Sequence, residues 1–179
     1  MKTLILLITL LSTLVAGTLD AQRYVTRNGV LQMRYKAPHG LMETVNRQVH
    51  VGLDVETGEF QLRIVMLSFR YDGGFHQEQH NEYFKENTHF SNSTFRGWIE
   101  NMDEIDFNTN GTYKVKVSGD LTLRMVTNQV ATTGDFIVKD DQFSGNAVFK
   151  VSLLDFGVNL PSSMEEFIEV RLDADLRRL

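Results

Sequence analysis

The sequence predicts an all-β fold, an antiparallel barrel or sandwich of about eight strands. From Tyr24 onward, apolar and polar residues alternate with a period of two. Short turn signals separate the alternating runs, and a hydrophobic content of 42% over 179 residues suffices for a single core. Because each run has one polar and one apolar face, we expect antiparallel pairing with one face of the sheet in water.

The expected strands follow one another with short connections. In TYKVKVSGDLTLR, for example, Tyr113, Val115 and Val117 share one face with Leu121, while Lys114 lies on the other. The same alternation predicts strands at residues 24–27, 30–36, 49–55, 60–69, 95–99, 113–124, 130–138, 143–151 and 168–176.

Turn residues predict where the chain reverses. Asn28-Gly29 is the strongest signal and predicts a two-residue hairpin loop. Weaker turns are expected at residues 56–58, 108–111, 127–128 and 139–141.

Residues 72–92 interrupt the alternation and predict a short helix or compact loop at one end of the fold. The stretch FHQEQHNEYFKE holds His76 and His80 four apart, a spacing known from zinc sites, with Glu82 and later His89 as possible further ligands. Gly73-Gly74 is expected to place His76 before the helix begins, which would separate the two histidines. We therefore expect no metal site and no catalytic residues here, and a metal-assisted enzyme that uses His76, His80 and Glu82 is the less favoured alternative. The sequence also lacks a nucleophile elbow and a phosphate-binding loop, and we expect no enzyme.

Composition and the first residues limit the class of protein. The net charge of −5 disfavours nucleic-acid binding, and the absence of cysteine excludes disulfides and thiolate chemistry. Residues 1–21 predict a signal peptide, with cleavage near 17 or 21, because one lysine precedes an apolar run too short to span a bilayer. The alternative is an uncleaved anchor. We expect residues 22–179 to form an exported domain, periplasmic or extracellular, without a stable transmembrane segment in the mature chain.

The apolar face mixes large and small residues. Aromatic rings at Phe95, Phe136 and Phe149 stand beside glycines such as Gly134 and Gly145. An eight-stranded barrel is either filled by its own side chains or holds one small ligand. An unfilled apolar interior would favour a long hydrocarbon. The residues alone leave both alternatives open.

Three segments carry a family resemblance. They are MLSFRYDGGFHQEQHNEYFKENTHFSNSTFRGWI, VSGDLTLRMVTNQV and LLDFGVNLPS, and in this order they resemble the YceI-like family over residues 24–176. The resemblance implies an extended lipocalin-like antiparallel barrel with a helix near one end. It also implies binding of a polyisoprenoid, isoprenoid quinone or other lipid in the central cavity, no catalysis, and no cofactor other than such a lipid.

The sequence departs from the family pattern mainly in connections. Gln79 and His80 replace the usual residues before Asn81, Ser91 replaces a proline, and Arg124-Met125 replaces a pair with a turn-adapted glycine. By the same resemblance, polar residues of the helix such as Asn81 and Glu82 would attach it to the barrel.

The inner face of the resembling barrel gives the predicted ligand-binding residues. They are Phe60, Leu62, Ile64, Met66, Phe95, Ile99, Tyr113, Val115, Val117, Leu121, Phe136, Phe149, Val151, Val170 and Leu172.

A second hypothesis is a non-catalytic envelope or stress-response protein that acts through a surface partner. Trp98 falls on the polar face by the period-two count and motivates this hypothesis. A homodimer is a further possibility, since sheet edges and an exposed tryptophan can support one.

Overall fold

The computed structural model describes residues 22–38, 40–160, 162 and 164–179. The strands are β1 (Arg23–Ala37), β2 (Gly40–Asp54), β3 (Glu59–Val65), β4 (Phe69–Tyr71), β5 (Asn92–Ile99), β6 (Gly111–Leu123), β7 (Val126–Lys139), β8 (Gln142–Ser152) and β9 (Phe167–Arg178). One α-helix, α1 (Gly74–Glu86), and four short 3₁₀ turns, η1 (Met66–Ser68), η2 (Thr88–Phe90), η3 (Met102–Glu104) and η4 (Leu154–Phe156), occupy the connections.

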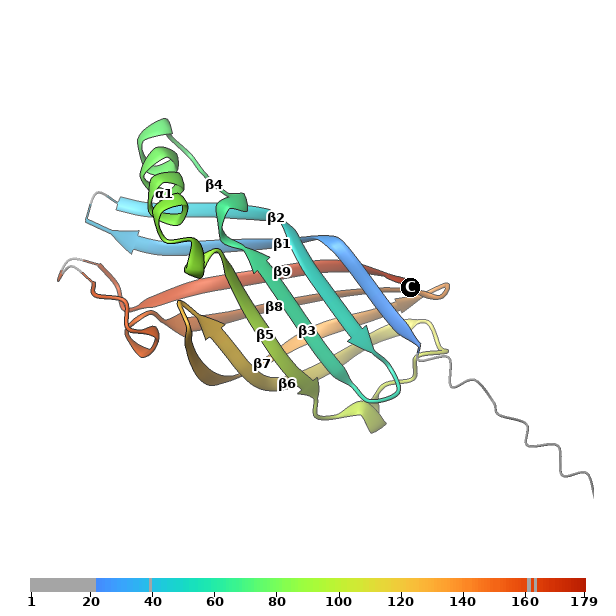
Figure 1. Cartoon of the computed structure of the whole chain (residues 1–179). Helices are drawn as coiled ribbons and strands as arrows, with labels where there is room; N and C mark the ends of the chain where they lie inside the picture. Colours follow the sequence, from blue (N-terminus) through green and yellow to red (C-terminus); the bar gives the residue numbers. More distant parts are fainter. Residues whose placement is uncertain (1–21, 39, 161, 163) are drawn as a thin grey trace, which may run out of the picture.

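The strands form one closed antiparallel sheet. Their order is β1-β9-β8-β7-β6-β5-β3-β2-β4, and a further pairing of β1 with β2 closes the ring (Figure 1). The three-residue β4 pairs with β2 next to β3 and stands outside the ring proper. The all-β barrel of about eight strands with a helix at one end is therefore confirmed.

Alternation places one face of each strand inside the barrel. In β5, Phe95 and Ile99 are buried while Arg96 and Trp98 are exposed. Gly97 and Gly119 face each other across β5 and β6, and a Cβ on Gly97 would collide with the carbonyl oxygen of Ser118. These two strands approach so closely that no side chain fits between them.

The predicted hairpin at Asn28-Gly29 is wrong. β1 runs through these residues, and its register against β2 shifts on either side of Gly29, so the pair forms a bulge. A Cβ on Gly29 would lie 3.0 Å from the carbonyl oxygen of Val49, which explains a glycine here without a turn. Ala37 of β1 pairs with Gly40 of β2, so the chain reverses after Ala37 instead.

The other turns were predicted with mixed success. Residues 56–58 do connect β2 and β3, and the Asp54 carboxylate accepts the N–H groups of Glu56 and Thr57 at 3.0 and 3.1 Å. Residues 139–141 also turn. The turn expected at residues 127–128 is wrong, because the chain reverses at Arg124 and Met125, whose φ angles are 52° and 66°.

Candidate ligand-binding cavity

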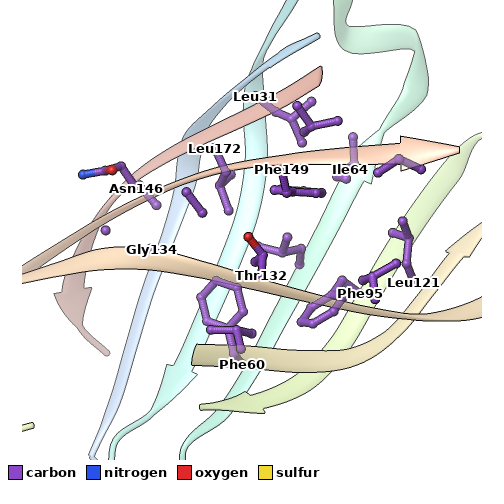
Figure 2. A pocket seen from close by; sticks show the side chains of 18 of the residues that line it. Leu31, Phe60, Ile64, Phe95, Leu121, Thr132, Gly134, Asn146, Phe149 and Leu172 are labelled. Carbon is purple, nitrogen blue, oxygen red and sulfur yellow. The ribbon is translucent and has the colours of Figure 1, made fainter. Parts of the chain in front are cut away.

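The barrel encloses a cavity of about 160 Å³. Side chains from strands all around the ring converge on it, among them Leu31, Phe95, Leu121 and Leu172 (Figure 2). Its wall is almost wholly apolar, so it offers hydrocarbon contacts to an occupant and few hydrogen bonds.

The structure places the predicted set at this cavity with one exception. Every predicted residue other than Tyr113 lines the wall. Tyr113 lies near the start of β6, outside the lining, and its hydroxyl donates to the carbonyl oxygen of Thr109 at 3.0 Å. The alternation correctly predicts which face of β6 holds Tyr113, but it does not predict the position of Tyr113 along the barrel axis. That the lining residues contact a ligand stays a prediction.

Sequence reasoning missed several lining residues. The apolar ones are Leu31, Met33, Leu53, Phe69, Leu123, Val130, Ala131, Ala147, Ile168, Ala174 and Leu176. Leu123, Ala174 and Leu176 continue the same alternation and could have been found from it. Leu31 and Met33 alternate within the strand expected at residues 30–36 and could have been found in the same way.

An aromatic cluster fills one end of the barrel. Phe136 and Phe143 lie with ring centroids 5.2 Å apart, Tyr24 stacks on Phe143 at 4.1 Å, and Phe107 contacts both phenylalanines at 5.7 Å. The two alternatives for the interior are thus both realised, since aromatic rings fill this end and leave free volume beyond it.

Helix α1 is attached at the opposite end by two polar side chains. Gln77 accepts the N–H of Tyr71 at 3.0 Å and donates to the carbonyl oxygen of Phe69 at 3.1 Å. The Nε2–H of His80 donates to the carbonyl oxygen of Met66 at 2.8 Å. Residues other than the expected Asn81 and Glu82 therefore attach the helix. Asn81 contributes only by accepting a hydrogen bond from the Gln77 side chain at 3.0 Å, which orients Gln77.

The helix also reaches the β6–β7 turn. The Arg124 guanidinium lies 5.2 Å from the ring centroid of Phe90 in η2 and 6.0 Å from that of Tyr83 in α1. On the barrel side, Phe84 is buried with its ring 4.8 Å from His80. Together α1 and η2 extend from β4 to the β6–β7 turn across this end.

His76 lies inside α1, contrary to expectation, because the helix begins at Gly74. Even so, no group of three or more His, Cys, Asp or Glu side chains within the described residues is placed to hold a metal ion. Burial lowers the pKa of His80, and the positive charge of Arg70 adds to this, while the bond to Met66 acts in the opposite direction. His80 is thus a neutral hydrogen-bond donor that joins the helix to the barrel.

Two further expectations concern the outside of the molecule. Trp98 does lie on the outer face, 48% exposed. None of the helices in the described part of the chain has the length and apolar character to cross a bilayer. The expected signal peptide, residues 1–21, lies outside the described residues.

Comparison with known proteins agrees with this architecture. Among solved structures, a polyisoprenoid binding domain from Saccharophagus degradans implicated in plant cell wall breakdown has a TM-score of 0.73 at 14% identity, covering 89% of this chain and 100% of that one. Burkholderia cenocepacia BcnA gives 0.63 at 16% identity, covering 83% and 95%. The Campylobacter jejuni YCEI protein gives 0.53 at 14% identity, covering 72% and 78%.

No curated protein matches the chain. The similarity to the solved structures shows a shared fold, since the identities are low. The family model described as the YceI-like domain matches residues 18–176, which is most of the sequence. With the barrel, the end helix and the apolar interior in place, the chain belongs to the YceI-like family.

Proposed function

We propose that this protein binds the apolar chain of a lipid, such as a polyisoprenoid or isoprenoid quinone, inside the barrel and carries it outside the cytoplasm. The observation that carries the proposal is free volume behind an apolar wall, where a soluble protein would ordinarily pack its own side chains. The solved domain described as polyisoprenoid binding supports the same class of ligand.

The free volume sets a scale for the interaction. A cavity of about 150 Å³ holds one benzene molecule, so the 160 Å³ here holds a segment of about six carbon atoms. At about 0.8 kcal/mol for each buried methylene, that segment contributes about 5 kcal/mol, which corresponds to dissociation constants on the order of 0.1–1 mM. A longer chain must therefore widen the barrel or extend out of it to bind more tightly.

The role is one of binding rather than catalysis. His80 on α1 is engaged by a backbone carbonyl. The cavity wall is almost wholly apolar, and of its two titratable residues in the described chain, Asp135 and Lys150, the first is paired with Lys114. General acid–base chemistry needs a titratable group within hydrogen-bond reach of the substrate, and this wall offers little of that kind.

Native mass spectrometry of protein purified from its own host tests the proposal. Released lipid, identified after extraction, is expected at a substantial fraction of the protein. Consistently empty protein that also fails to take up an added fatty acid would refute the binding function.

A second candidate is surface recognition of a partner or of a second copy of the chain. The exposed Trp98 supports it, because tryptophan is enriched at interfaces. Trp98→Ala should then reduce partner recovery or dimer formation without changing lipid content. Unchanged recovery would remove the basis of this candidate.

A further inference from the structure

The hydrogen-bond ladder between β7 and β8 covers only part of the two strands. Pairing runs from Gly134↔Ala147 to Lys139↔Gln142. Residues 126–133 of β7 pair only with β6, and residues 148–152 of β8 pair only with β9. The barrel wall therefore contains a slit between these two edges.

The cavity lining includes exposed residues at this slit. Among the described residues that line the cavity, Ala131 and Lys150 are exposed, whereas all the others are buried or half-buried. Ala131 lies on the β7 edge and Lys150 on the β8 edge. Continued in the same register, the ladder would make these two residues partners, so they mark opposite sides of one opening.

Other elements cover the two ends of the barrel. The aromatic cluster around Phe136 and Phe143 fills one end of the barrel. Helix α1 and η2 extend over the other end and are tied to Arg124. Near the β6–β7 turn, at one end of the slit, the Asn128 side chain donates to the carbonyl oxygen of Asp155 at 2.7 Å and joins β7 to η4. The slit is thus a bounded window in the wall.

Polar residues of the cavity lining lie on the edges of the window, as Thr132 and Lys150 do, or just beyond its end, where Asp135 and Asn146 pair in the ladder. Thr132 and Asp135 belong to β7, and Asn146 and Lys150 to β8. The other polar side chain of the lining is that of Ser93, whose hydroxyl donates to the sulfur of Met66 at 3.3 Å. Asp135 is paired with Lys114, while Lys150 forms no ion pair with any described residue.

We infer that the ligand enters through the slit between β7 and β8, and that it is a single-chain amphiphile whose tail lies in the cavity and whose polar end stays in the slit. The inference rests on the proposed lipid binding and specifies the class of lipid and its orientation. An apolar wall with hydrogen-bonding groups beside an opening fits a slim chain that ends in a compact polar group.

Cross-linking the slit tests the route. The chain has no cysteine, so Ala131→Cys with Lys150→Cys gives one unique pair across the slit, and a short bismaleimide can join it. The matched control is Ile137→Cys with Ser144→Cys, which are partners inside the ladder. Stopped-flow uptake of the fluorescent fatty acid cis-parinaric acid is the readout, and mass spectrometry verifies each cross-link.

The cross-link at the slit should slow uptake about tenfold or more relative to the same variant before cross-linking, and the control cross-link should not. Unchanged uptake with the slit cross-linked, or equal slowing in the control, would overturn the route. If the parent protein binds no cis-parinaric acid at all, the proposed function itself fails.

Contact quenching tests the orientation. A bimane on Ala131→Cys should be quenched more strongly by 2-bromohexadecanoic acid, whose bromine is beside the carboxyl group, than by 16-bromohexadecanoic acid, whose bromine is at the tail. Equal quenching, absent quenching or the reverse order with bound ligand would overturn the assignment of the polar end to the slit.

Discussion

Replacing Ala147 with phenylalanine should block the cavity. Ala147 lines it at the edge of the β7–β8 ladder, and the substitution adds a six-carbon ring. Since a cavity of about 150 Å³ holds one benzene molecule, the ring takes up most of the 160 Å³ available. The loss is at most about 5 kcal/mol, the contribution of about six methylenes. A flexible chain that recovers half of its contacts would bind roughly 60-fold more weakly.

Fluorescence titration with cis-parinaric acid measures this loss. The matched control is Val148→Phe, because Val148 is the next residue, points outward and is 54% exposed. Its affinity should stay within about twofold of the parent, as expected for a side chain outside the cavity. Overpacking costs about 1–3 kcal/mol of stability, so circular dichroism must show that Ala147→Phe is folded. A folded Ala147→Phe with the parent affinity would refute the placement of the ligand in the cavity.

Three further predictions concern stability. Because burial lowers the pKa of His80, the unfolded chain takes up a proton before the folded protein does as the pH falls below about 6.5, and the free energy of unfolding should drop there. Urea titrations at pH 5 to 8 should show a smaller drop for His80→Gln than for the parent protein. An identical pH profile for the two proteins would contradict this. Gly97→Ala should lower the free energy of unfolding by about 2 kcal/mol or more, because the added methyl group pushes β5 and β6 apart. The control Gly52→Ala should change it little, because nothing lies within 4 Å of a Cβ at that position. Similar denaturant midpoints for the two variants would be contrary evidence. Met125→Gly should raise the free energy of unfolding by about 0.5–1 kcal/mol, because Met125 is exposed and glycine adopts its positive φ without strain. A lower melting temperature would count against this.

Period-two alternation predicted most of the barrel because its physical cause is local. Each residue of a strand faces either the interior or water, and its type follows from that environment: Phe95 is apolar and buried, while its neighbour Arg96 is charged and exposed. The inner faces of β3, β5 and β8 could therefore be predicted, and with them most of the cavity wall.

Turns were harder, because a glycine has more than one use. Gly29 looked like a hairpin residue, yet it serves the close approach of β1 to Val49. Conversely, the turn at Arg124 and Met125 has no glycine or asparagine to indicate it, although both residues adopt positive φ. Here the pairing of β6 with β7, which continues to Leu123 and Val126, holds the two residues in a conformation that their types disfavour. The local sequence therefore does not indicate the turn.

The end helix and the slit depend on distant pairs of residues. The spacing of His76 and His80 drew attention to metal binding, whereas the bond that His80 makes joins it to Met66, 14 residues away in the sequence. The length of the β7–β8 ladder is likewise invisible in either strand alone, since both continue to alternate beyond its end.

The small cavity and the interrupted ladder together explain how a long chain could be held. Where a strand ladder is continuous, widening the barrel would break backbone hydrogen bonds at a net cost of about 0.5–1.5 kcal/mol each. Between residues 126–133 and 148–152 no ladder bonds exist to be broken, so the wall can spread there at lower cost. Open strand edges normally invite pairing with another chain, and a charged side chain on such an edge opposes it. The exposed Lys150 lies on that edge, so it can protect the slit from association while leaving it free to admit a ligand.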